Sequence, residues 1–206
     1  MFSAFLPDVD FKVYDICHNH FPASANDCDV YLMTGSKYSV YDSLEWIDQT
    51  KEFLRNIYAA EKYFIGICFG HQMMAEALGG KVQKSDKGWC VGVHNFTLSK
   101  RFDWMTPHRE NVNLIMSCQD QVILLPIDSQ IIAQSADCPA GIFTIGEKML
   151  GIQGHPEFPK EYSRMLIKER REKIGADKSV KAIDSLKLDL DVDIISQWIM
   201  HFAAGQ

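Results

Sequence analysis

The chain has 206 residues and a formal net charge of −6, and 47% of its residues are hydrophobic. This length and composition are typical of one globular domain with a sizeable core, so we treat residues 1–206 as a single domain. The acidic balance, without clustered Lys and Arg, excludes the charge footprint of a nucleic-acid-binding protein. No apolar run approaches the roughly 20 residues that a membrane span needs.

Cysteine usage and the first residues indicate the compartment. The six cysteines show no CxxC spacing, which is typical of reduced thiols and not of a disulfide framework. The first residues lack the basic run followed by an apolar run that is typical of a signal peptide. We therefore expect a cytoplasmic protein that does not associate with membranes.

The first part of the chain alternates between short apolar runs and helical patterns. Val30–Met33 predicts a strand that enters a tight loop at Thr34–Ser36. Residues 44–60 carry apolar side chains at the helical period. Residues 64–67 predict a buried strand, and a helical pattern over 72–78 follows it and stops at two glycines.

The rest of the chain has a different pattern. Five short β-prone runs are separated by turn residues: 91–98, 114–117, 131–133, 142–145 and 149–152. Two helices are predicted after Pro159. This order predicts an α/β fold with a mostly parallel, flavodoxin- or Rossmann-like sheet. Helices would cover both faces, and a small antiparallel β insertion would occupy the middle of the chain.

The sharpest local motif is Gly66-Ile67-Cys68-Phe69-Gly70. A predicted strand here meets a predicted helix, with small residues two positions before and after a cysteine, which is typical of a nucleophile elbow. A thiol at a helix N-terminus is also favoured as a thiolate. Taken alone, the motif is equally compatible with a buried core cysteine.

A second motif supports the catalytic interpretation. Gly154-His155-Pro156-Glu157 follows another predicted strand. A cysteine nucleophile needs an imidazole base, and the base needs an orienting carboxylate. Residues two apart on an extended segment point to the same side, so His155 and Glu157 are placed to act together with Cys68.

These two motifs resemble the signatures of class I glutamine amidotransferase domains, including that of GMP synthetase. Three further segments resemble the family in the same order: Leu32–Ser36, Gly88–Val93 and Ser117–Val122. The resemblance runs from about Phe11 to at least Phe158.

The resemblance implies a role for each matching residue. Cys68 would attack a γ-carboxamide to form a γ-glutamyl thioester, His155 would transfer protons, and Glu157 would orient His155. The backbone N–H of Phe69, with one from the Gly35–Ser36 turn, would hold the oxyanion. Gln72 and Asp120 would contact the substrate, and the reaction needs no cofactor and no metal.

The sequence departs from the family pattern in two places. Cys118 stands where the family usually has histidine. Residues 1–6 resemble the tail of the family's first helix, so the first strand of the family is expected to be absent.

Three functions remain open at this point. The chain could hydrolyse glutamine or other γ-glutamyl compounds by itself, or donate ammonia to a separate synthetase partner. It could also be a non-catalytic regulatory module, although the intact set of Cys68, His155 and Glu157 argues against that alternative.

Overall fold

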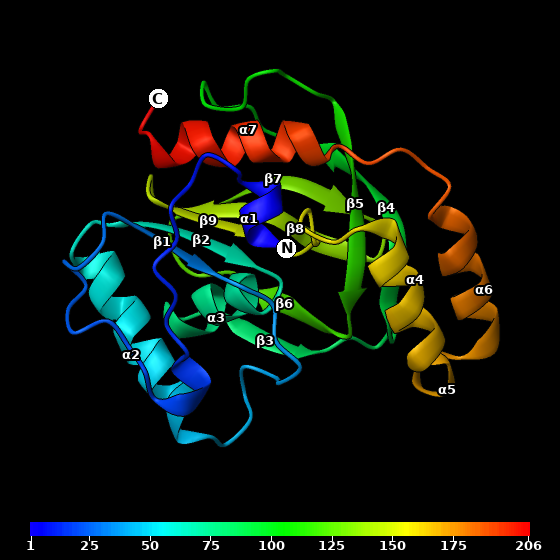
Figure 1. Cartoon of the computed structure of the whole chain (residues 1–206), viewed down its shortest axis with the longest axis horizontal. Helices are drawn as coiled ribbons and strands as arrows, with labels where there is room; N and C mark the ends of the chain where they lie inside the picture. The colour runs from blue at the N-terminus through cyan, green and yellow to red at the C-terminus, as the bar shows by residue number, and fades with distance from the viewer.

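The computed structural model describes all residues from Met1 to Gln206. A central sheet runs through the molecule, with helices above, below and beside it (Figure 1). The helices are α1 (Phe2–Phe5), η1 (Ile16–His18), α2 (Glu45–Ala59), α3 (Phe69–Ala77), α4 (Lys160–Glu169), α5 (Arg171–Ile174), α6 (Ala176–Ser185) and α7 (Val192–Ala203). The strands are β1 (Val30–Met33), β2 (Tyr63–Ile67), β3 (Lys81–Lys84), β4 (Cys90–Leu98), β5 (Asn111–Cys118), β6 (Asp120–Leu124), β7 (Ser129–Ser135), β8 (Cys138–Ile145) and β9 (Met149–Ile152).

The main sheet has seven strands in the order β1-β2-β9-β8-β7-β4-β5. Parallel pairing joins β1, β2 and β9, and the remaining strands continue the sheet in antiparallel pairing. Strands β3 and β6 form a small antiparallel sheet of their own. The predicted α/β class is confirmed, and so are the antiparallel strands in the middle of the chain, which form β4, β5, β7 and β8.

Each face of the sheet has its own apolar core. Helices α1 and α7 pack on one face through a cluster of 23 buried residues. Helices α2 and α3 pack on the other face through a cluster of 18, and the two layers are visible above and below the sheet in Figure 1. A smaller cluster of seven buried residues joins α4–α6 to β4 and β5. Because both faces are covered, the short strands of the sheet centre are apolar on both sides.

Two parts of the predicted element order were wrong. The chain after Pro159 forms four helices, because α5 and α6 lie between the two that were predicted. The buried side chains of α5 and α6 are Ile174, Ser179 and Ala182, so few large apolar residues mark these helices in the sequence. Strands β3 and β6 were also missed, because they are short runs that pair only with each other.

The first strand of the structure is β1, which lies at an edge of the sheet. It pairs with β2 alone, and the chain before it contains only α1, η1 and irregular backbone. That the first strand of the family is absent stays a prediction. None of the helices combines the length and the apolar character that a passage through a bilayer requires.

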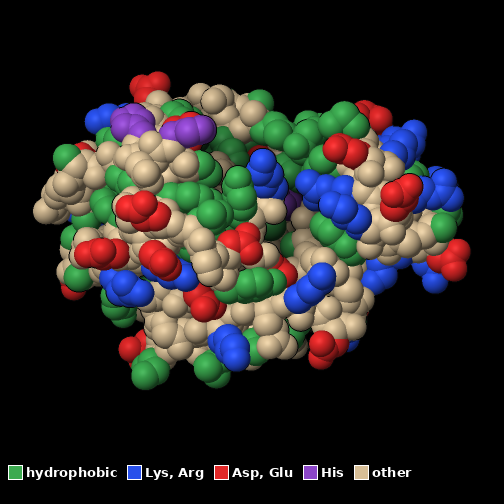
Figure 2. Space-filling model, turned by 90° about the horizontal axis from the view of Figure 1, so that it is seen from below, with side chains coloured by type: hydrophobic (Ala, Val, Ile, Leu, Met, Phe, Trp, Pro, Cys, Tyr) green, Lys and Arg blue, Asp and Glu red, His purple; other side chains and the backbone are tan.

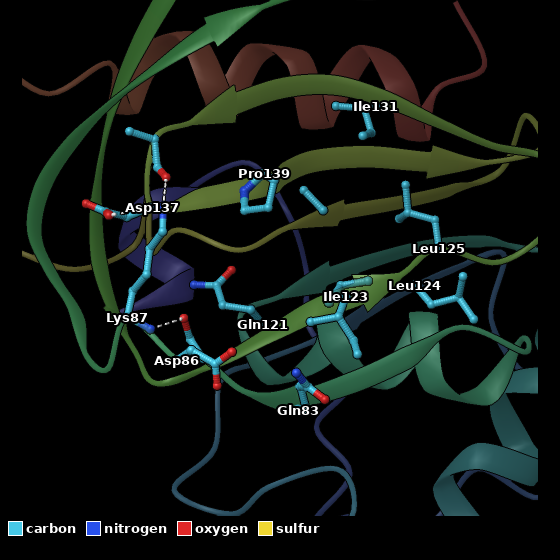
Figure 3. Close-up of a pocket in the computed structure, with 14 residues that line it drawn as sticks. Gln83, Asp86, Lys87, Gln121, Ile123, Leu124, Leu125, Ile131, Asp137 and Pro139 are labelled. Atoms are coloured by element: carbon cyan, nitrogen blue, oxygen red, sulfur yellow. Dashed lines mark hydrogen bonds and ion pairs between the residues drawn. The ribbon is translucent and has the colours of Figure 1, made fainter.

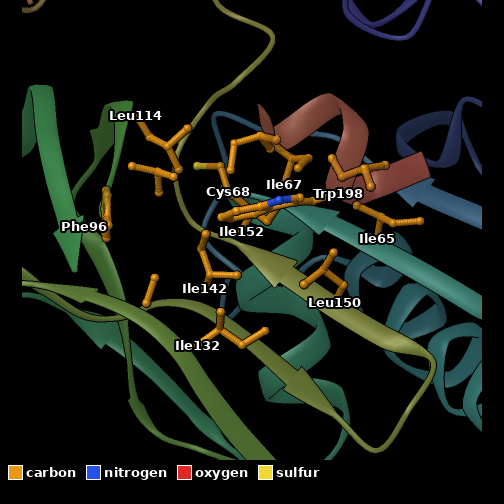
Figure 4. Packing of buried hydrophobic residues seen from close by; sticks show 14 of the residues in the cluster. Ile65, Ile67, Cys68, Phe96, Leu114, Ile132, Ile142, Leu150, Ile152 and Trp198 are labelled. Carbon is orange, nitrogen blue, oxygen red and sulfur yellow. The ribbon is translucent and has the colours of Figure 1, made fainter. Parts of the chain in front are cut away.

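Helix α7 is held by one large aromatic side chain. Trp198 is 2% exposed and lies against Ile65, Ile67 and Ile152 from the parallel strands (Figure 4). Its indole Nε1 donates a hydrogen bond to the Pro107 carbonyl oxygen at 3.0 Å, which satisfies the buried polar atom.

We predict that Trp198→Ala lowers the free energy of unfolding by about 3–5 kcal/mol, because it removes a large buried side chain and leaves a cavity. Met200→Ala is the matched control, because Met200 lies on the same helix and is 37% exposed. Its cost is expected to stay below about 1 kcal/mol. Urea denaturation of both variants measures the difference, and equal losses would contradict the assigned core position.

Candidate active site

Cys68 lies at the turn between β2 and α3. It is the residue immediately before α3 and has φ 52° and ψ −97°. Positive φ is unfavourable for a residue with a side chain and costs on the order of 1–3 kcal/mol. Surrounding contacts fix this conformation, since the Cys68 N–H donates to the Ile152 carbonyl at 2.9 Å and its carbonyl accepts from Gln72 N–H at 3.0 Å. The sharp strand-to-helix turn that the motif predicts is present.

The two glycines of the motif are required by close backbone contacts. A Cβ on Gly66 would lie 2.4 Å from the Gly70 carbonyl carbon, and one on Gly70 would lie 2.4 Å from the Met33 carbonyl oxygen. Neither approach is possible for a residue with a side chain. Strand β2, helix α3 and the end of β1 therefore meet more closely than any other residue type at these positions would allow.

His155 and Glu157 form a buried pair in the loop after β9. The His155 Nδ1 atom lies 2.8 Å from Glu157 Oε1, and their side chains are 5% and 2% exposed. Phe158 stacks on the imidazole at 3.9 Å between ring centroids and an interplanar angle of 14°. The ring is thus held by a carboxylate at its edge and an aromatic side chain on its face.

Neighbouring groups in the site raise the pKa of His155. Burial alone lowers the pKa of His155, but the charge and hydrogen bond of Cys68, and then those of Glu157, outweigh burial and raise the pKa to about 10. A protonated imidazole between a sulfur and a carboxylate is the arrangement of an activated cysteine nucleophile. The structure therefore brings together Cys68, His155 and Glu157 as the sequence predicts.

The Gly35–Ser36 turn follows β1 and borders both reactive groups. A Cβ on Gly35 would lie 2.9 Å from His155 Cε1 and 3.6 Å from Cys68 Cβ. Phe69 is the first residue of α3, so its N–H has no acceptor within the helix. The turn and the start of α3 therefore lie on either side of Cys68, where an oxyanion site would need them.

Gln72 is a buried anchor of the site. Its Nε2 atom donates to the Asp120 carbonyl oxygen at 2.9 Å and to Gln153 Oε1 at 3.0 Å. These bonds tie α3 to the start of β6 and to the residue just after β9. Gln153, which the sequence analysis passed over, is fully buried.

Asp120 connects the loop after β1 to the small sheet. Its carboxylate accepts hydrogen bonds from Ser39 Oγ at 2.5 Å and Tyr41 OH at 2.8 Å. Asp120 thus holds residues 39–41 against the site. No local pattern indicates this contact, because the partners are about 80 positions apart.

His71, inside the elbow motif, is a packing residue. It is fully buried, and its ring packs edge-on against Phe143 at 4.7 Å between centroids. Burial lowers its pKa to about 3, so the ring is neutral at neutral pH. This location on α3 separates His71 from the pair formed by His155 and Glu157.

The surface has two concave regions, and Cys68, His155 and Glu157 do not line one of them. In Figure 2 the face seen from below is hollowed between the α2–α3 side and the α4 side, and Lys and Arg side chains lie on both rims. A pocket of about 560 Å³ lies elsewhere, between the small sheet and the β7–β8 hairpin (Figure 3). Cys68, His155 and Glu157 do not line that pocket.

With the site described, the chain can be compared with known proteins. Residues 9–171 match the family model of the class-I glutamine amidotransferases. The chain belongs to this family. A γ-glutamyl peptidase 3 from Arabidopsis thaliana is 31% identical over 193 residues, covering 87% of this chain and 76% of the relative. A glutamine-hydrolysing GMP synthase from Porphyromonas gingivalis is 28% identical over 192 residues, covering 81% of this chain and 37% of the synthase.

Solved structures agree on the fold. A glutamine amidotransferase from Thermotoga maritima superposes with a TM-score of 0.81 at 16% identity, covering 96% of this chain and 88% of that one. Another from Methylobacillus flagellatus also gives 0.81, at 22% identity and with 99% and 87% coverage. The chain is an enzyme of the glutamine amidotransferase type, with the sheet and helix arrangement of these structures.

We predict that Gly35→Ala lowers kcat/KM by at least about tenfold, since the added methyl group would displace the His155 ring. Thr34→Ala is the control from the same loop, because Thr34 is exposed and its hydroxyl bonds only the Gly35 carbonyl oxygen, at 3.3 Å. Its activity should stay within about twofold of the wild type. Thermal melting of both variants checks that the fold persists, and full activity of folded Gly35→Ala would contradict the close contact.

Proposed function

We propose that this protein hydrolyses the γ-amide bond of glutamine or of another γ-glutamyl compound, with Cys68 as nucleophile and a γ-glutamyl thioester as intermediate. The single observation that carries the proposal is the elbow cysteine beside the buried pair of His155 and Glu157. The match to a γ-glutamyl peptidase over 87% of the chain supports the same chemistry.

The first half of the reaction forms the thioester. The Cys68 sulfur attacks the γ-carbonyl carbon, and the carbonyl π electrons move to the oxygen. The N–H groups of Phe69 and of the Gly35–Ser36 turn stabilise that oxyanion. When the C–N bond breaks, protonated His155 gives its proton to the leaving nitrogen, which departs as ammonia or as a free amine.

The second half returns the enzyme to its starting state. His155, now neutral, takes a proton from water, and the resulting hydroxide attacks the thioester carbon. The C–S bond breaks, glutamate is released, and the Cys68 thiolate is restored beside the imidazolium. Glu157 keeps the imidazole oriented in both halves through the 2.8 Å contact to Nδ1.

Substrate recognition is assigned to groups around this centre. Gln72 uses its amide nitrogen within the protein, which leaves its Oε1 as an acceptor for a substrate ammonium group. Asp120 positions the loop on the same side of the site through its hydrogen bonds with Ser39 and Tyr41. Lys and Arg side chains border the hollow in Figure 2 together with Asp and Glu side chains, and the cations suit the carboxylate that every γ-glutamyl compound carries.

We predict that Cys68→Ala abolishes glutamate release, with a loss in kcat of several orders of magnitude, because no other group can form the thioester. Cys17→Ala, which alters an exposed cysteine, serves as the control and should keep wild-type activity. Glutamate is measured after incubation with glutamine and with γ-glutamyl dipeptides. More than a few per cent of wild-type activity in pure Cys68→Ala protein would overturn the assignment.

The second candidate function is ammonia donation to a separate synthetase, which the similarity to a GMP synthase favours. We expect the purified protein alone to release glutamate, with a higher kcat/KM for γ-glutamyl dipeptides than for glutamine. Release from glutamine only, with dipeptides inert, would favour the donor function instead. A folded protein that is silent with both substrates would indicate dependence on a partner.

A further inference from the structure

A second group of sulfur atoms lies close to the active site but takes no part in the proposed reaction. Cys90 at the start of β4 and Cys118 at the end of β5 are directly opposed Cα partners in the antiparallel ladder. Opposed residues in such a ladder have Cα atoms about 4.5–5.5 Å apart. A disulfide requires about 4.4–6.8 Å between Cα atoms, so the two backbones already stand at bonding distance.

The two side chains also face the same way. Cys90 and Cys118 are 4% and 6% exposed and belong to the same buried cluster on the α7 face of the sheet. Both thiols are free in the structure. Joining their sulfurs therefore needs rotation of two side chains and no rearrangement of strands.

A histidine lies beside Cys90. Both imidazole nitrogens of His94 are 3.7–3.8 Å from the Cys90 sulfur, and Asp137 lies 3.9 Å from His94 Nδ1. Burial lowers the pKa of His94, but the hydrogen bond and charge of Cys90, the Val91 carbonyl and the charge of Asp137 raise it overall. These neighbours thus favour the protonated form of the ring beside the Cys90 sulfur.

The two sulfurs differ in proton affinity. A hydrogen bond with Cys118 lowers the pKa of Cys90 most, burial opposes it, and His94 lowers it further, to about 6. The same hydrogen bond, burial, and the charges of Cys68, Cys90 and Cys138 raise the pKa of Cys118. The surroundings thus favour the thiolate form at Cys90 and the thiol form at Cys118, which suits a nucleophilic and a resolving cysteine.

We propose that Cys90 and Cys118 are a redox-active pair that is oxidised by a peroxide to a reversible disulfide between β4 and β5, separate from the catalytic cysteine. The Cys90 thiolate attacks one peroxide oxygen, the O–O bond breaks, and hydroxide leaves and takes a proton to become water. Sulfur loses two electrons and becomes a sulfenic acid. Cys118 then attacks that sulfur, the S–S bond forms, and the S–O bond breaks, with the Cys118 proton leaving in a second water.

The approach to this pair differs from the approach to Cys68. Asp137 and Lys87 line one end of the pocket in Figure 3, and Asp137 is the residue that faces His94. Asp137 thus stands between that pocket and His94. A disulfide between Cys90 and Cys118 would nevertheless affect the active site. Cys118 lies two residues before Asp120, which forms hydrogen bonds with Gln72 and Ser39.

The test is disulfide mapping of the native protein. The full chain is treated with hydrogen peroxide at about stoichiometric concentration, unreacted thiols are alkylated, and the peptides are analysed by mass spectrometry. We expect a cross-linked peptide pair containing Cys90 and Cys118, which dithiothreitol converts back to two thiols. Retention of both as free thiols, or cross-links only between other cysteines, would overturn the proposal.

Variants separate the pair from general oxidation. The same treatment of Cys68→Ala should still consume two thiols, because the catalytic sulfur is not required. Cys138→Ser is the matched control in the same cluster and should leave the cross-link intact. His94→Gln should slow disulfide formation at pH 7 by roughly three- to tenfold and shift the pH midpoint of Cys90 alkylation upward. An unchanged midpoint in folded His94→Gln would remove His94 from the proposal.

Discussion

The close approach of β2, α3 and the end of β1 is the constraint on which the active site depends. Gly66 and Gly70 leave no side chain between the backbones, and a single added methyl group at either position would lie within 2.4 Å of a backbone atom. This contact forces the chain to reverse sharply at Cys68, which accepts a positive φ of 52°. The helix N-terminus is thereby directed at the sulfur, and the loop after β1 is brought to its side. The turn at Cys68 and its place at the start of α3 thus have one common origin.

Near that turn, the charged groups of His155 and Glu157 are buried away from solvent. His155 and Glu157 are almost completely buried, and a charged imidazole is tolerated there only because a carboxylate and a sulfur flank it. Phe158 covers the ring and removes its freedom to turn. By contrast, His71 lies in equally deep burial without such partners, and its pKa falls to about 3. The environment and not the residue type therefore decides which of the two imidazoles is positively charged.

Long-range hydrogen bonds complete the site from distant parts of the chain. Asp120 binds Ser39 and Tyr41 through its carboxylate and Gln72 through its carbonyl oxygen. The end of β5, the small sheet, the loop after β1 and α3 are therefore mechanically joined. Because β5 ends at Cys118 and β6 begins at Asp120, the residues proposed to contact the substrate and the proposed redox pair are joined through one short segment.

The sequence by itself determined the α/β class and the motifs at Cys68 and His155, because strand and helix periods and the glycines beside the nucleophile are local properties. The structure shows Cys68, His155 and Glu157 assembled as those motifs predicted. Helices α5 and α6 were missed because they bury few large apolar side chains, and β3 and β6 because each pairs only with a distant strand. Only the tertiary structure decided the hydrogen bonds of Asp120 with Ser39 and Tyr41 and the position of Cys90 opposite Cys118. Those contacts depend on strand register and loop packing, which join residues that no local pattern relates.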